Sequence, residues 1–76
     1  MVDALIRGLH EVIVFYGVYI ENPYSVKPEE ISQVKDITKK IIKGCNEYNI
    51  DYHSVMLEEL GDEKKVDEIL KFYEVE

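Results

Sequence analysis

This 76-residue chain has few of the residues that usually mark a catalytic or metal site. Its one cysteine, Cys45, has no second cysteine in the chain to form a disulfide with, and no CxxC pair is present. The two histidines, His10 and His53, have no cysteine or histidine neighbour at a metal-ligand spacing. The four glycines are too scattered to form a phosphate-binding loop. We therefore predict no catalytic residue, no metal site and no cofactor.

The chain also lacks a long apolar segment and an excess of positive charge. The most apolar run, residues 12–20, is well short of the roughly 20 residues that a membrane helix needs, and no signal-peptide pattern is present. Sixteen acidic residues against nine basic ones give a net charge of −7, which removes the electrostatic attraction to nucleic acid. We therefore expect a soluble, cytoplasmic protein that binds neither membranes nor nucleic acid directly.

No internal repeat, low-complexity segment or linker divides the sequence, so residues 1–76 are predicted to form one small globular domain. A chain of this length buries only roughly 60% of the surface that its unfolded form exposes. Chains this short often add a disulfide, a metal or a second copy of themselves. With no disulfide or metal expected here, self-association is the remaining option.

Residues 12–20 (VIVFYGVYI) can be interpreted in two ways. Five of the nine are β-branched and one is Gly17, which favours a strand with apolar side chains on both faces. The alternative is one helix over residues 3–20, because apolar residues also recur at helical spacing, at Leu5, Leu9, Val12, Tyr16 and Tyr19. We expect the strand and keep the helix as the alternative.

The next element is a helix over residues 28–48. Pro28 suits its first position, with Glu29 and Glu30 at the positive end of the helix dipole. Its apolar stripe is predicted to consist of Ile31, Val34, Ile37, Ile41, Ile42, Cys45 and Tyr48. Gly44 inside it indicates either an early helix end or a close approach to a neighbouring element.

Residues 52–60 again fit two structures. The side chains of Tyr52, Ser54 and Met56 alternate with those of His53, Val55 and Leu57, which favours a second strand, reached from the first by a helical crossover. Residues 56–60 also suit a helix that ends at Gly61. Beyond it, Asp62 is predicted to cap a last helix that extends to Tyr73. The expected fold is a small two-layer α/β (or α+β) domain of the βαβα type with an N-terminal lead-in. The alternative is an all-α bundle of three or four helices.

With no catalytic constellation, the function that we expect is regulation or inhibition of another protein by direct binding. Six tyrosines combine apolar area with a hydroxyl, a combination enriched at protein interfaces. The residues predicted to contact a partner are Ile13, Phe15, Tyr19, Tyr24, Glu58, Glu59, Asp62 and Glu63. Because a strand over residues 12–20 would keep one face bare, we also predict a homodimer, with Ile13, Phe15 and Tyr19 at its centre.

Two other functions stay open. The first is a small enzyme or ligand-binding subunit whose site is completed at a homo-oligomer interface, using His10, Glu11, His53 or Cys45. The second is an acidic mimic of nucleic acid that blocks a DNA-binding protein. Its acidic face would consist of Glu58, Glu59, Asp62, Glu63, Asp67 and Glu68.

Overall fold

The computed structural model describes residues 2–75, which form four α-helices and one short 3-10 turn. The helices are α1 (Val2–Glu21), α2 (Pro28–Glu47), α3 (Tyr52–Leu60) and α4 (Glu63–Phe72), and the turn η1 (Pro23–Ser25) connects α1 to α2. No strand occurs among the described residues. The predicted α/β fold is therefore wrong, and the alternative of a helical bundle is confirmed.

The helix α1 contains residues 12–20, which were expected to form a strand. Leu9, Val12 and Tyr16 recur every three or four residues on one face of α1 and are its buried residues. Burial of such a stripe stabilises a helix more than the modest strand preference of β-branched residues opposes it. Gly17, which was taken as evidence against a helix, lies in α1, and a Cβ added to it would meet no neighbouring side chain within 4 Å.

The helix α2 confirms the prediction of a helix that begins at Pro28, and Gly44 lies inside it. Its apolar stripe differs in part from the prediction. Ile42 and Cys45 are buried, whereas Ile37 and Tyr48 are each at least half exposed. The buried position nearest Ile37 is Thr38, whose hydroxyl donates a hydrogen bond to the Val34 carbonyl at 2.7 Å.

Residues 52–60 form α3, so the strand expected there is also wrong. The Asp51 side chain accepts a hydrogen bond from the Ser54 backbone N–H at 3.2 Å, which caps the start of α3. Gly61 ends it in the left-handed conformation (φ 69°), where glycine has no steric cost. Asp62 caps α4 as predicted, with its carboxylate accepting a hydrogen bond from the Lys64 N–H at 3.0 Å.

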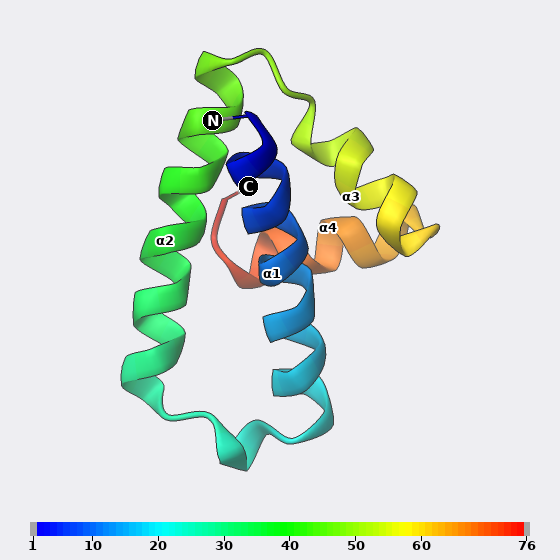
Figure 1. The fold of residues 1–76 in the computed structure, drawn as a ribbon. Coiled ribbons are helices and arrows are strands. Elements are labelled where there is room, and N and C mark those ends of the chain that lie inside the picture. Colours follow the sequence, from blue (N-terminus) through cyan, green and yellow to red (C-terminus); the bar gives the residue numbers. More distant parts are fainter. Residues whose placement is uncertain (1, 76) are drawn as a thin grey trace.

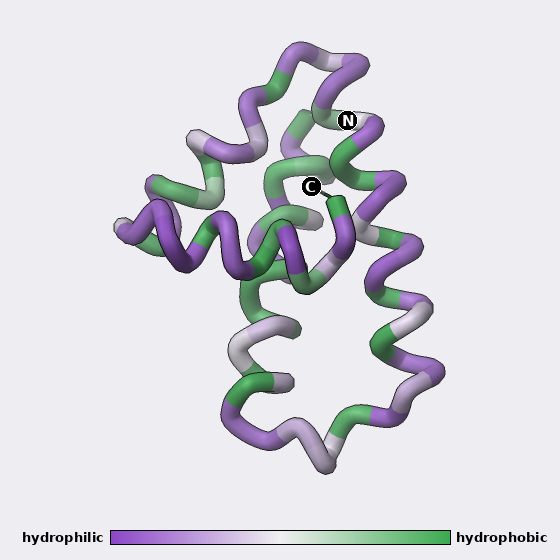
Figure 2. The backbone as a smooth tube through the Cα atoms, turned by 180° about the vertical axis from the view of Figure 1, so that it is seen from behind, coloured by the Kyte–Doolittle hydropathy of each residue, from purple (hydrophilic) through white to green (hydrophobic). Residues whose placement is uncertain are grey.

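The two long helices form an antiparallel hairpin (Figure 1). The helix α3 lies beside α1 on the side away from α2, and α4 crosses behind α1. From behind, α3, α4 and the C-terminal segment cover only the part of the hairpin away from the turn (Figure 2). The part that adjoins the turn extends beyond them, and no other element lies over it in either view.

Two groups of buried side chains form the core. The larger one joins α1 to α3, α4 and the C-terminal segment, and it consists of Val12, Tyr16, Met56, Val66, Ile69, Leu70 and Tyr73. The smaller one joins α1 to α2 and consists of Leu9, Ile42 and Cys45. Tyr73 is fully buried, and its hydroxyl donates a hydrogen bond to the Val12 carbonyl at 2.8 Å. This bond fixes the end of the chain to the middle of α1.

A candidate protein-binding groove between α1 and α2

Two glycines bring α1 and α2 close together at the end of the hairpin away from the turn. A Cβ atom added to Gly8 would lie 2.9 Å from Ile41 Cδ1, and one added to Gly44 would lie 2.8 Å from Leu5 Cδ2. The predicted close approach at Gly44 is thus confirmed. We call residues 2–9 and 41–47, which include both contacts, the closed end of the hairpin.

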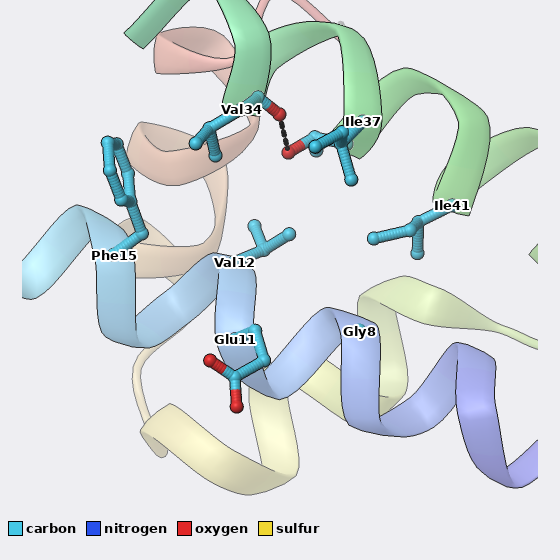
Figure 3. A pocket seen from close by; sticks show the side chains of 8 residues that line it. Gly8, Glu11, Val12, Phe15, Val34, Ile37 and Ile41 are labelled. Atoms are coloured by element: carbon cyan, nitrogen blue, oxygen red, sulfur yellow. Dashed lines mark hydrogen bonds between the residues drawn. The ribbon is translucent and has the colours of Figure 1, made fainter. Parts of the chain in front are cut away.

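A groove begins at this contact and extends toward the turn. Its volume is about 350 Å³, and its lining residues come from both long helices: Gly8, Glu11, Val12, Phe15, Val34, Ile37, Thr38 and Ile41. In Figure 3 the side chains of Val12, Phe15, Val34 and Ile41 point into the space between the helices, whereas the Glu11 carboxylate points away from α2. The groove is therefore apolar inside and carries one carboxylate at its α1 edge.

Apolar side chains continue from the groove onto the surface near the turn. Val14 is 48% exposed, Val18 is 50% exposed and Ile37 is 54% exposed. Val14 and Val18 follow Glu11 by three and seven residues, so they lie on the same face of α1 as that carboxylate. We call residues 14–21 and 28–37 the open end of the hairpin. Exposed apolar side chains beside an apolar groove are a feature found at interaction sites.

The charges at the open end are mostly negative. Residues 14–21 and 28–37 carry four carboxylates, on Glu21, Glu29, Glu30 and Asp36, against the single ammonium of Lys35. Lys35 Nζ lies 2.9 Å from Glu74 Oε2, so its charge is already paired, and this ion pair lowers the pKa of Glu74. None of the lining residues is cationic. The open end of the hairpin therefore carries a net negative charge.

The structure separates the residues that the sequence predicted to bind a partner. Phe15 lines the groove and Tyr24, 98% exposed, lies in the turn beyond the open end. Ile13 is half-buried against the larger core group. Tyr19 is half-buried as well, and its ring stacks on Phe72 with 5.0 Å between the ring centroids. Ile13 and Tyr19 thus pack within the chain, and the bare strand face that suggested a homodimer is absent.

The acidic residues predicted as a second part of the site lie elsewhere, on α3 and at the start of α4. Glu58, Glu59, Asp62 and Glu63 are all exposed there. Glu59 Oε1 lies 3.0 Å from His10 Nδ1, so this carboxylate connects α3 to α1. The structure does not bring this acidic group together with the groove residues.

The side chains considered for catalysis are also apart. His10 points to Glu59, and His53 Nε2 lies 3.6 Å from Asp67 Oδ1, on α4. Cys45 is fully buried in the smaller core group, and burial raises the pKa of its thiol, which keeps the sulfur in its unreactive form. Within residues 2–75, no group of three or more histidine, cysteine or acidic side chains could hold a metal ion.

Sequence reasoning missed Ile37 and Val18 as site residues. Both were assigned to buried faces, Ile37 through the stripe of α2 and Val18 through the supposed strand. Spacing alone shows that Ile37 lies at the edge of that stripe, next to Gln33 and Lys40 on the helix surface. That position is a signal of partial exposure, although it gives no information about the groove.

Comparisons with protein-family models, with curated proteins and with solved structures find no match to this chain. The structure itself shows four α-helices in residues 2–75 and a groove between the two helices of the hairpin. None of the helices in residues 2–75 combines the length and the apolarity that crossing a membrane requires.

Proposed function

We propose that this chain is a non-enzymatic protein that regulates or inhibits another protein by binding it through the open end of the hairpin. The observation that supports the proposal is the set of exposed apolar side chains around the groove, Val14, Val18 and Ile37, with Phe15 inside it. Val14, Val18 and Ile37 keep 48%, 50% and 54% of their surface exposed, whereas Phe15 is half-buried against the larger core group. A partner that covers them removes apolar surface from water, which is the main driving force of protein association.

The proposal places the protein in the cytoplasm. Cys45 has no disulfide partner within the chain and is buried as a thiol, which suits a reducing compartment.

Two valines on the same helix provide a matched test of the surface. Val18 lies at the open end and is 50% exposed, and Val2 lies at the closed end and is 43% exposed. Three tagged proteins should be expressed in the native host: wild type, Val18→Asp and Val2→Asp. Each is captured through its tag at two salt concentrations, and the proteins bound to it are identified. We expect one host protein to be recovered with wild type and Val2→Asp and lost with Val18→Asp. Equal circular dichroism melting curves should show that all three are folded.

Two results contradict the proposal. One is recovery of the wild-type chain alone at both salt concentrations. The other is a bound protein that Val18→Asp and Val2→Asp retain or lose equally, because such a protein does not use the open end.

The two other functions have less support. An enzyme built from His10, Glu11, His53 and Cys45 needs these groups to converge, yet His10 and His53 pair with different helices and Cys45 is buried. An acidic mimic of nucleic acid has the exposed carboxylates of α3 and α4, but Glu59 and Asp67 face histidines. The lysines of α4, Lys64, Lys65 and Lys71, further weaken its negative field.

A further inference from the structure

We propose that the groove holds one amphipathic helix of the partner protein, with apolar side chains between α1 and α2 and lysine or arginine side chains facing Glu11 and Glu30. This inference rests on the proposed function and specifies its ligand.

The spacing of the lining residues fits a helix. On α1 they are residues 8, 11, 12 and 15, and on α2 they are residues 34, 37, 38 and 41. Both sets follow the pattern i, i+3, i+4 and i+7, so each wall of the groove is two turns of a helix surface, about 10 Å long. A third helix can place its own i, i+3 or i+4, and i+7 side chains between two such walls, as helices do when they pack.

The backbone requirements of the occupant also favour a helix. An extended peptide usually binds by adding a strand to the edge of a sheet, which satisfies its backbone N–H and C=O groups. Residues 2–75 contain no strand, and the groove lining is apolar apart from Glu11 and the Thr38 hydroxyl, which already donates to the Val34 carbonyl. A helix satisfies its backbone internally and therefore leaves no additional backbone group unpaired when it enters this groove.

A second copy of the chain fits the groove less well. A two-fold contact places the same surface on both sides, so that one hollow would face the other and leave a void. If instead the Val14 and Val18 ridge of each copy enters the groove of the other, the contact closes as a dimer but brings together the acidic open ends of two chains that each carry a net charge of −7. A separate convex helix fills the groove without either problem.

The charges around the groove indicate a cationic helix. Glu11 lies at the α1 edge, and Glu30 precedes Val34 by one turn on α2, in line with the lining residues. Neither carboxylate forms an ion pair with a described residue. Lysine or arginine beside the apolar stripe of the occupant would meet these carboxylates, whereas an acidic helix would be repelled by them.

A display library of random 18-residue peptides tests the inference on the full chain. Peptides that bind the double variant Val18→Gln/Ile37→Gln are first removed from the library, and the remaining peptides are selected on wild type. Both substitutions keep the net charge of the protein unchanged. We expect the enriched peptides to be apolar at i, i+3 or i+4, and i+7, to carry net positive charge, and to become helical on binding. A synthetic copy of the best peptide should bind the double variant about tenfold or more weakly than wild type.

The variant Glu11→Gln/Glu30→Gln measures the charge contribution. It should weaken the same peptide about threefold to tenfold at low salt and less at high salt, whereas Val2→Asp should not change its binding. Melting curves of each variant separate loss of binding from loss of folding.

Several results overturn the inference. They are enrichment of acidic or proline-rich extended peptides, no peptide that distinguishes wild type from Val18→Gln/Ile37→Gln, and palmitate binding to the groove in place of any peptide. Light scattering gives a further such result if the mass of wild type is twice 8.9 kDa and that of Val18→Gln/Ile37→Gln is 8.9 kDa. The occupant of the groove is then a second copy of the chain. A native partner that depends on Val18, found together with any of these results, leaves the proposed function intact and removes only the helix.

Discussion

The two ends of the α1–α2 hairpin have similar helices but opposite surroundings. At the closed end, Gly8 and Gly44 let the helices touch, and Leu9, Ile42 and Cys45 are buried between them and their neighbours. At the open end only Tyr16 is buried. Phe72, at the end of α4, packs on Tyr16 and Tyr19, and the part next to the turn extends beyond α3 and α4. The closed end therefore contributes stability, and the open end leaves Val14, Val18 and Ile37 exposed.

Truncation of an apolar side chain should lower the free energy of unfolding strongly at the closed end and very little at the open end. Leu9 is fully buried, so Leu9→Ala should lower the free energy of unfolding by about 2–5 kcal/mol. Val18 is half exposed, so Val18→Ala should change it by no more than about 0.5 kcal/mol. Urea denaturation of both variants measures the difference, and equal losses would contradict the division into two ends.

A larger side chain at Gly44 should force the closed end apart. Its Cβ would meet Leu5 Cδ2 at 2.8 Å, so Gly44→Val should cost about 1–3 kcal/mol. Addition of Leu5→Ala removes the atom in the way, so the double variant should lose less than the sum of the two single losses. A double-mutant cycle by urea denaturation measures this coupling, and strictly additive losses would show that the two helices do not touch there.

The hydroxyl of Tyr73 should contribute a smaller part of the free energy of unfolding, and this part should depend on pH. Tyr73→Phe removes the hydrogen bond to the Val12 carbonyl and should cost about 0.5–1.5 kcal/mol at pH 7. Burial, and secondly Tyr16, raise the pKa of Tyr73 above its ordinary value near 10, so the folded state keeps a proton that the unfolded state releases. Stability is then fully present below about pH 10 and is lost as the pH rises further.

The control for this pH dependence is the variant itself. Denaturation midpoints at about pH 8 and pH 11 should converge for wild type and Tyr73→Phe as the pH rises, because only wild type has this phenol to ionise. An alkaline loss of the same size in both proteins would assign it to other groups, such as the Cys45 thiol, whose pKa is also raised by burial.

The smallest effect should be a gain in stability at the open end. No atom lies within 4 Å of a Cβ added to Gly17, so Gly17→Ala should stabilise α1 by about 0.5–1 kcal/mol through helix propensity alone. The same substitution at Gly8 brings its Cβ to 2.9 Å from Ile41 Cδ1 and should gain less. Thermal unfolding compares the two, and a larger gain at Gly8 would mean that the closed end is not tightly packed.

The sequence predicted best where local signals agree. Pro28, with the acidic residues that follow it and the apolar stripe beyond them, correctly predicted α2, and Asp62 correctly marked the start of α4. The strand predicted over residues 12–20 was wrong because the β-branched residues there favour a strand whereas the spacing of the apolar residues favours a helix. The outcome depends on the burial of Leu9, Val12 and Tyr16 against α2, α3 and α4, which a local pattern does not contain.

The candidate site was predicted only in part. Phe15 and Tyr24 were predicted to contact a partner, and this stays a prediction; the structure places Phe15 in the groove lining and Tyr24, exposed, in the turn. Ile37 was assigned to the core because its position in the stripe gives its direction on the helix but not the distance to the next helix. That distance is set by contacts between the two helices at Gly8 and Gly44, which the apolar stripe of α2 alone does not contain.

The bond between Tyr73 and Val12 has a consequence for the order of folding. It joins residues 61 positions apart, and Tyr73 belongs to the same buried group as Val12 and Tyr16. A chain that is still being synthesised, with only α1, α2 and α3 complete, lacks the side chains of α4 and therefore exposes Val12 and Tyr16 to water. The larger core group can close only when Tyr73 has emerged from the ribosome, which makes the residue that follows α4 a requirement for the full burial of α1.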